Sequence, residues 1–229
     1  VRSSAASDVY KRQVYECLKE SEDSSTFLVK ETATGILCVL KWGRNRQAEF
    51  LRNEMEIMEK MADRKLSGIP KTYRIFEENG EVYLVREYIE GMSLAQMVLQ
   101  KGGISEAEIC RISRKICQTA EQFQNPDEPM IHRDIKPENI VVTPGGEVVF
   151  IDFGTMRSYK KDGSRDTFVV GTRGTAAPEQ YGYTQTDQRT DVYAIGQTML
   201  YMVSESYEMN QLSELSLIHI SEPTRPLYI

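Results

Sequence analysis

The sequence of 229 residues contains little of what marks several specialised classes of protein. Its apolar runs are short, such as residues 148–151, whereas a membrane-spanning helix needs roughly 18 consecutive apolar residues. Basic residues do not predominate, since 28 lysines and arginines stand against 34 aspartates and glutamates, and this argues against a nucleic-acid-binding face. The four cysteines form no Cys-x-x-Cys pair, so we expect a reduced, intracellular chain without a zinc site.

The two ends of the sequence are related in an unusual way. The codons GAT GTG TAT AAG AGA CAG encode residues 8–13, and their reverse complement, CTG TCT CTT ATA CAC ATC, encodes residues 215–220. This DNA resembles the transposase-end adaptor of shotgun sequencing libraries. We therefore expect residues 1–13 and 215–229 to be adaptor-derived and exclude them from reasoning about the fold. The remaining residues, 14–214, are then expected to be a fragment in which His132 is the one histidine.

The chain up to residue 90 has the pattern of an antiparallel sheet with one helix. Apolar residues at helical intervals predict an amphipathic helix over residues 48–61, and Asn79-Gly80 is a strong hairpin signal. Strands are predicted at residues 14–30 (two, around a polar bend at 19–25), 35–41, 71–78 and 81–87.

The chain from residue 91 to 214 is mainly helical in pattern. Ser105 and Glu108 form a capping box at the start of a long helix. Further helices are predicted at residues 93–100 and 191–203, short strands at 140–142 and 148–151, and a long loop at 154–180. The sequence therefore predicts an α+β protein with a sheet-rich lobe at 14–90 and a helical lobe at 91–214.

Three ordered motifs carry the chemistry. Residues 132–139 read His-Arg-Asp-Ile-Lys-Pro-Glu-Asn, residues 152–154 read Asp-Phe-Gly, and residues 177–179 read Ala-Pro-Glu. Together they closely resemble the serine/threonine branch of the protein kinase family, and the style of residues 177–182 is similar to that of bacterial members. The resemblance implies a two-lobed kinase fold, incomplete at its C-terminus, with ATP and Mg²⁺ bound between the lobes.

The resemblance also implies the roles of the catalytic residues in phosphoryl transfer. Asp134 would accept the proton of the substrate hydroxyl, and Lys136 would neutralise charge on the transferring phosphate. Asn139 and Asp152 would supply oxygen ligands to Mg²⁺.

Lys41, at the end of a predicted strand, matches the family lysine that holds the α- and β-phosphates. Its ion-pair partner is expected on the first long helix. Glu54 fits best there, with Glu56 as a rival that points to a different face of the helix.

The nucleotide-binding stretch departs from the family pattern. Residues 18–26 contain no glycine, although glycines normally let backbone N–H groups approach phosphate closely. Its acidic residues would either weaken ATP binding or point outward. The resemblance implies nucleotide contacts from Leu18, Ser21, Ser24, Thr26, Lys41, Glu87, Ile89 and Asp152.

Arg86 precedes the hinge, at a position where an apolar or small side chain usually lines the adenine pocket. Either this arginine shortens the back of the pocket, or its charged end reaches out to solvent.

The remaining motif residues have regulatory or structural roles by the same resemblance. Thr167, with Ser164 second, is the candidate phosphosite in an activation segment, and a plain solvated loop is the alternative. Arg133 would pair with the phosphorylated residue, and Thr172 would contact the catalytic aspartate and favour serine or threonine as the acceptor. Structural roles are expected for His132, Glu179 and Asp191, with Glu179 lacking the arginine partner that longer relatives provide.

These observations predict an ATP- and Mg²⁺-dependent serine/threonine protein kinase of bacterial signalling, which acts on a protein substrate in the cytoplasm. A pseudokinase that serves as a binding or scaffold module is the first alternative, and a small-molecule kinase the second. A membrane tether elsewhere in the full-length protein and the activity of the fragment itself both stay open.

Overall fold

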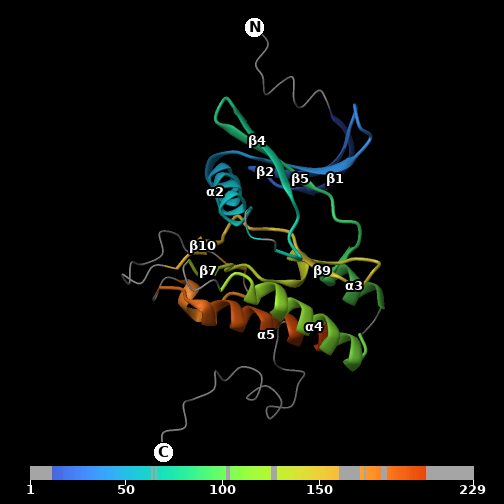
Figure 1. The fold of residues 1–229 in the computed structure, drawn as a ribbon, viewed down its shortest axis with the longest axis vertical. Coiled ribbons are helices and arrows are strands. Elements are labelled where there is room, and N and C mark those ends of the chain that lie inside the picture. Colours follow the sequence, from blue (N-terminus) through green and yellow to red (C-terminus); the bar gives the residue numbers. More distant parts are fainter. Residues whose placement is uncertain are drawn as a thin grey trace, which may run out of the picture. The chain divides into compact units, whose positions relative to one another are not determined.

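The computed structural model describes residues 12–62, 64, 66–101, 104–124, 128–159, 171–172, 174–181 and 185–204 (Figure 1). The chain divides into two compact units. The first unit comprises Val1–Glu90 together with Asp152–Gly154, and the second comprises Gly91–Ile151 and Thr155–Ile229. The predicted α+β fold is confirmed, since the first unit is rich in strands and the second in helices.

The first unit is a five-stranded antiparallel sheet in the order β1-β2-β3-β5-β4, with helix α2 packed against it (Figure 1). Its elements are β1 (Arg12–Glu20), β2 (Ser24–Glu31), β3 (Leu37–Gly43), α2 (Asn45–Met61), β4 (Thr72–Glu78) and β5 (Glu81–Glu87). The predicted hairpin joins β4 to β5. Asn79 and Gly80 have φ values of 52° and 82°, which a two-residue hairpin turn requires.

The two faces of β5 pack against different partners because successive side chains point to opposite sides of a strand. On one face, Val82 and Leu84 pack against Ala48 and Leu51 of α2. On the other face, Val85 packs in a second cluster with residues of β2 and β3. Helix α2 therefore packs on one face of the sheet, the face toward which Lys41 of β3 points.

Helix α2 begins at Asn45, three residues earlier than the periodicity predicts. Only Arg44 separates α2 from the end of β3 at Gly43. A Cβ atom on Gly43 would lie 3.0 Å from the backbone carbon of Gln47, so a glycine permits this close approach of strand and helix.

The described residues of the second unit form three α-helices and two small sheets, with strand orders β6-β8-β9 and β10-β7. Its elements are β6 (Met92–Ser93), α3 (Leu94–Lys101), α4 (Glu106–Glu121), β7 (Met130–Ile131), η1 (Pro137–Asn139), β8 (Ile140–Val142), β9 (Val148–Phe150), β10 (Arg157–Ser158), η2 (Pro178–Tyr181) and α5 (Gln188–Ser204). The predicted cap of α4 is confirmed, because the Ser105 side chain accepts a hydrogen bond from the N–H of Glu108.

The segment predicted as a loop, residues 154–180, contains two short regular elements. β10 pairs with β7 through Arg157–Ile131 and Ser158–Met130, and a 3₁₀ turn, η2, begins at Pro178. Both elements are too short to produce a periodic pattern in the sequence.

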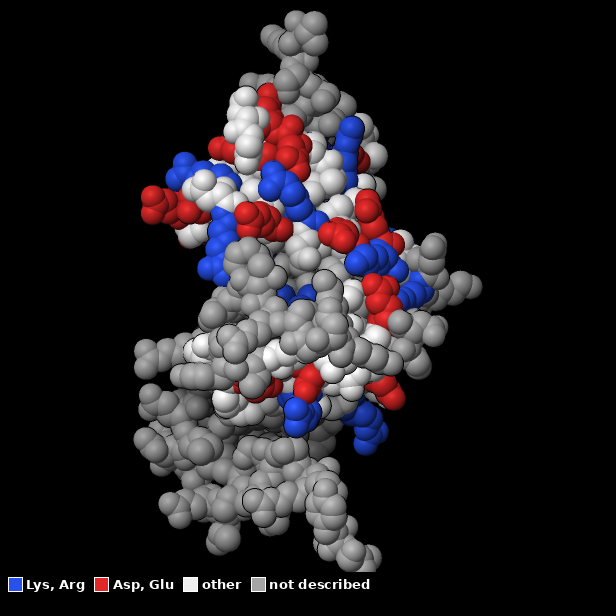
Figure 2. Space-filling model, turned by 90° about the vertical axis from the view of Figure 1, so that its left-hand side faces the viewer, with Lys and Arg blue, Asp and Glu red and all other residues white. Residues whose placement is uncertain are grey.

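The surface of the described residues carries charges of both signs. Basic and acidic side chains are interspersed on the face shown in Figure 2. In the first unit, Arg52 pairs with Glu77 at 2.7 Å. A search of the described helices finds none that is both long and apolar enough to cross a membrane. All four cysteines are free thiols.

Candidate active site

The first unit holds a buried cluster of charges between β3 and α2. Lys41 is 8% exposed and Glu54 1% exposed. The Lys41 Nζ donates to both carboxylate oxygens of Glu54, at 3.0 and 2.7 Å, and to the Oδ1 of Asp152 at 3.3 Å. The rival Glu56 is exposed and pairs with Lys60 instead, so Glu54 is the glutamate of α2 that contacts the lysine.

Burial dominates the electrostatics of this cluster. It raises the pKa of Glu54, while the positive charge of Lys41 lowers it and the negative charge of Asp152 raises it further. A buried carboxylate is tolerated only when a cation and hydrogen bonds compensate the lost hydration. The two hydrogen bonds from Lys41 provide that compensation and fix the lysine on the inner face of the sheet.

The Asp-Phe-Gly motif belongs to the same unit. The Asp152 Oδ1 also accepts a hydrogen bond from the N–H of Gly154, and the Nδ2 of Asn53 donates to the Gly154 carbonyl at 2.9 Å. Asn53 was not singled out from the sequence. The only feature of the sequence that points to Asn53 is that it precedes Glu54, because the same part of α2 contacts the Asp-Phe-Gly motif.

The glycine-free stretch forms a tight turn between β1 and β2. Ser21 and Ser24 hydrogen-bond to each other through N–H, hydroxyl and carbonyl groups. No described residue from 20 to 25 has a positive φ, which explains how the turn forms without glycine. The Asp23 carboxylate is bound by Arg44 Nε at 2.8 Å and by Asn45 Nδ2 at 3.0 Å. Arg44 therefore compensates the negative charge of Asp23 in this turn.

The other predicted nucleotide contacts lie on the same sheet or just after its strand β5. Leu18 is exposed on β1, and Thr26 on β2 lies opposite Lys41 on β3. Glu87 ends β5, and its side chain accepts a hydrogen bond from the N–H of Lys71. Ile89 follows β5 as a half-buried residue.

Arg86 is 4% exposed. The expectation that its charged end reaches solvent is therefore wrong. Its Nη1 donates to the carbonyl of Glu87 at 3.2 Å, and the guanidinium stays inside the unit.

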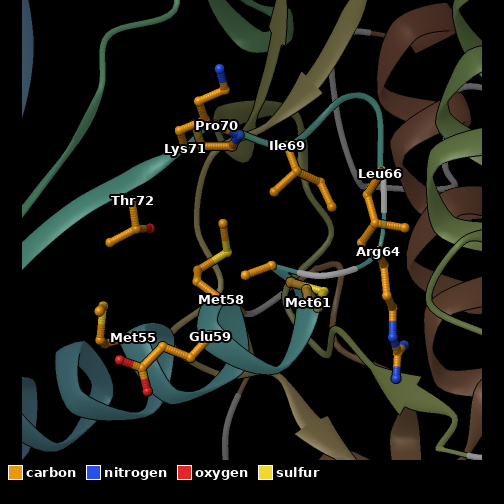
Figure 3. Close-up of a pocket in the computed structure, with 11 residues that line it drawn as sticks. Met55, Met58, Glu59, Met61, Arg64, Leu66, Ile69, Pro70, Lys71 and Thr72 are labelled. Carbon is orange, nitrogen blue, oxygen red and sulfur yellow. The ribbon is translucent and has the colours of Figure 1, made fainter.

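A separate cavity of about 450 Å³ lies in the first unit, between the second half of α2 and the segment that leads into β4 (Figure 3). Its lining residues are Met55, Met58, Glu59, Met61, Ala62, Arg64, Leu66, Ile69, Pro70, Lys71 and Thr72. None of the predicted site residues is among them. We therefore do not assign this cavity to the reaction.

The second unit holds a network centred on Asp134. The Thr172 hydroxyl donates to the Oδ1 of Asp134 at 2.7 Å, and the Lys136 Nζ lies 2.7 Å from Oδ2. The same Nζ donates to the Thr172 hydroxyl at 2.6 Å. The carboxylate is thus held in one orientation with a fixed cation beside it. A general base needs such an orientation to accept a proton, and the cation can offset negative charge that develops nearby.

Asn139, in η1, supports the same aspartate. Its Nδ2 donates to the Asp134 carbonyl at 3.1 Å and to Oδ2 at 2.9 Å. Because both bonds use the amide nitrogen, the amide oxygen has no hydrogen-bond donor among the described residues. An amide oxygen here and a carboxylate at Asp152 are the kinds of ligand that Mg²⁺ prefers, so both residues fit the metal that the family uses.

The backbone of the catalytic segment is braced by Asp191 of α5. Its carboxylate accepts hydrogen bonds from the N–H groups of His132 and Arg133, at 2.8 and 2.9 Å. Arg133 has a φ of 68°, a strained value for a residue with a side chain, and Gln180 Nε2 binds its carbonyl at 2.7 Å. Burial raises the pKa of Asp191 to about 6, although the two backbone N–H groups favour its ionised form. Gln180 is a further residue that the sequence did not single out.

His132 is fully buried, and its ring packs against those of Phe123 and Phe150. Glu179 accepts a hydrogen bond from the hydroxyl of Thr190 at its Oε1, at 2.7 Å. The Nε of Arg133 donates to the Thr155 carbonyl at 2.7 Å.

The candidate phosphosites, Thr167 and Ser164, lie outside the described residues.

Known proteins resemble the chain over most of its length. A family model described as protein kinase domain matches residues 13–222. The chain is 32% identical to serine/threonine-protein kinase D of Synechocystis sp. over 164 residues, which are 69% of this chain and 31% of that protein. It is 29% identical to the probable serine/threonine-protein kinase PknB of Corynebacterium glutamicum over 185 residues, 78% of this chain and 28% of that protein.

Resemblance extends to a eukaryote. The serine/threonine-protein kinase cds1 of Schizosaccharomyces pombe is 26% identical over 202 residues, 82% of this chain and 42% of that protein. The chain thus spans less than half the length of each of these three relatives. Its match to the family model, its two-unit α+β fold and the ordered motifs agree, and the chain belongs to the protein kinase family.

Proposed function

We propose that the chain catalyses Mg²⁺-dependent transfer of the γ-phosphoryl group of ATP to serine and threonine hydroxyls of proteins. The Asp134 network carries this proposal, because it joins a carboxylate, a cation and a threonine hydroxyl at 2.6–2.7 Å. The names of the three relatives described above, each of which is called a serine/threonine-protein kinase or a probable one, support the choice of acceptor.

The residues of the two units would have different roles in the transfer. In the second unit, Asp134 would orient the acceptor hydroxyl and accept its proton, while Lys136 would offset the charge on the phosphoryl group. In the first unit, Lys41, held by Glu54, would bind the nucleotide phosphates. Magnesium on the nucleotide supplies charge neutralisation, and Asp152 and Asn139 would be its protein ligands.

No specific observation favours a pseudokinase or a small-molecule kinase. Lys41, Asp134, Asn139 and Asp152 are all present, and each takes part in hydrogen bonds suited to its expected role. The turn that replaces the glycine-rich loop forms without strain, and Arg44 compensates the charge of Asp23. The absence of glycine therefore does not by itself argue against ATP binding.

We further propose that the chain acts in cytoplasmic signalling, where ATP and protein substrates are available. Phosphorylation of Thr167, or of Ser164, would add negative charge that Arg133 can bind, because a guanidinium pairs well with a phosphate. This regulation is an extension of the proposed activity and does not alter its chemistry.

The acceptor class can be tested with three peptides of one basic sequence that differ only in carrying serine, threonine or tyrosine. The chain is incubated with γ-labelled ATP and Mg²⁺, and label on each peptide is counted. We expect label on the serine and threonine peptides and none on the tyrosine peptide. Label confined to tyrosine, or ATP binding without label on any peptide or on the chain itself, would overturn the proposal.

A further inference from the structure

The face of the sheet that carries α2 includes an arginine in an apolar row. Val82 and Leu84 of β5 are completely buried against α2. Alternate residues of a strand share a face, so Arg86 lies on the same side as these two. An arginine that follows two buried aliphatic residues on one face needs a reason other than packing alone.

The strand register puts this arginine beside Lys41. In the antiparallel pair of β3 and β5, Arg86 lies opposite Val39, and Lys41 lies opposite Leu84. Arg86 and Lys41 are therefore diagonal neighbours on one face, where long side chains can act on the same groups. Two cations thus project from the sheet toward the helix that carries Glu54.

The interior position of Arg86 makes its charge costly unless anions compensate it. Burial lowers the pKa of its guanidinium, whereas the negative charges of Glu54, Asp152 and Glu87 raise it. Its Nε is buried and has no hydrogen-bond partner among the described residues, and Nη1 binds only a backbone carbonyl. The compensation is therefore electrostatic and comes from Glu87 and from Glu54 and Asp152, the two carboxylates that Lys41 binds.

Arg86 offsets one of the negative charges that face Lys41. Lys41 alone would face Glu54 and Asp152 with a net charge of −1. With Arg86 the four groups sum to zero. A triphosphate is strongly anionic, so the extra cation removes a repulsion that the nucleotide would otherwise meet.

We propose that Arg86 is a positioning residue for the nucleotide phosphates: its charge offsets that of the Glu54 carboxylate beside Lys41 and leaves the lysine available to the triphosphate. This inference rests on the proposed function, since it assigns Arg86 to the same ATP site. The residue acts through Glu54 and Lys41 and through the charge of the site.

The test compares the affinities of the full chain for ATP with Mg²⁺ and for adenosine, which lacks phosphates, measured by calorimetry. Arg86→Met removes the charge, and Arg86→Lys retains it. We expect Arg86→Met to weaken ATP binding about tenfold, the effect of one unit charge acting over about 10 Å at an effective dielectric constant of about 20. Adenosine binding should change less than about twofold, and Arg86→Lys should keep most of the ATP affinity.

The matched control is Arg52→Met, which removes the same charge from an exposed arginine of the same unit. It should leave ATP affinity unchanged. Arg86→Gln, polar and uncharged, provides the same comparison should Arg86→Met fail to fold.

Three results would overturn the inference. They are equal losses of ATP and adenosine binding in Arg86→Met, an Arg86→Lys variant as weak as Arg86→Met, and unchanged ATP affinity in both variants. A wild-type chain that binds neither ligand would overturn the proposed function itself, and so is distinguishable from these.

Discussion

At the scale of single residues, each predicted catalytic group is held by partners that leave it little freedom. Lys41 is fixed by Glu54 and Asp152, and Asp134 by Thr172, Lys136 and Asn139. Phosphoryl transfer depends on positioning and on charge more than on covalent chemistry. Such a reaction requires catalytic groups in a defined geometry, and the hydrogen bonds of Lys41 and Asp134 provide it.

Asp191 gives a prediction for pH dependence. Its pKa is raised by burial from 3.8 to about 6. A carboxyl with a folded-state pKa above its unfolded value stabilises the fold fully below the unfolded value and loses that contribution as pH rises through the folded value. We therefore expect its contribution to the free energy of unfolding to fall by about 3 kcal/mol between about pH 4 and pH 6.

The measurement compares thermal unfolding of the wild-type chain and Asp191→Asn from pH 4 to pH 7. Asparagine does not ionise, so the stability of the wild type relative to the variant should decrease across this range. A difference in stability that does not change with pH would show that Asp191 titrates as an ordinary carboxyl.

The residues that lie in continuous motifs could be predicted from the sequence, and those set by long-range packing could not. Asp134, Lys136 and Asn139 lie within one eight-residue motif, so their mutual spacing is visible in the sequence. The buried position of Arg86 depends on the register of β3 with β5, and the role of Gln180 depends on a backbone carbonyl 47 residues away. Neither relation leaves a local pattern.

At the scale of elements, most of the strands and helices of both units follow from periodicity and turn chemistry. The hairpin of β4 and β5 turns at Asn79-Gly80 as predicted, and α4 begins after the predicted cap at Ser105. The early start of α2 was not predicted because Asn45 to Gln47 are polar and carry no apolar periodicity. Two-residue strands such as β10 are too short to be predicted at all.

Helix α2 provides a matched pair of substitutions. Glu54→Gln removes a buried charge that binds Lys41, whereas Glu56→Gln removes the same charge from an exposed residue two positions away. We expect Glu54→Gln to lower kcat/KM for ATP on the order of 10- to 100-fold, because Lys41 loses its anchor. Glu56→Gln should stay within about twofold of the wild type, since exposed ion pairs contribute little.

Steady-state kinetics with a serine peptide and varied ATP would give both values. Equal losses in the two variants would mean that the negative charge of α2, and not the contact with Lys41, determines activity. Circular dichroism of both variants controls for loss of the helix.

At the scale of the whole molecule, the predicted groups are divided between two compact units. The first unit carries Lys41, Glu54 and Asp152, and the second carries Asp134, Lys136 and Asn139. The segment that returns to the first unit, Asp152–Gly154, directly follows Ile151, whose N–H binds the Asn139 carbonyl at 3.0 Å. Neither unit alone contains all of these groups, so the proposed phosphoryl transfer would need residues of both units.

The most direct test of this account follows the transfer of label from γ-labelled ATP, with Mg²⁺, to a serine- and threonine-containing protein acceptor. Wild-type chain and Asp134→Asn are compared at saturating nucleotide. We expect label on serine and threonine with the wild type, and a loss on the order of 10²- to 10⁴-fold in the variant, which cannot accept the hydroxyl proton. Equal transfer by the two proteins, or none by a wild type that binds ATP, would contradict the account.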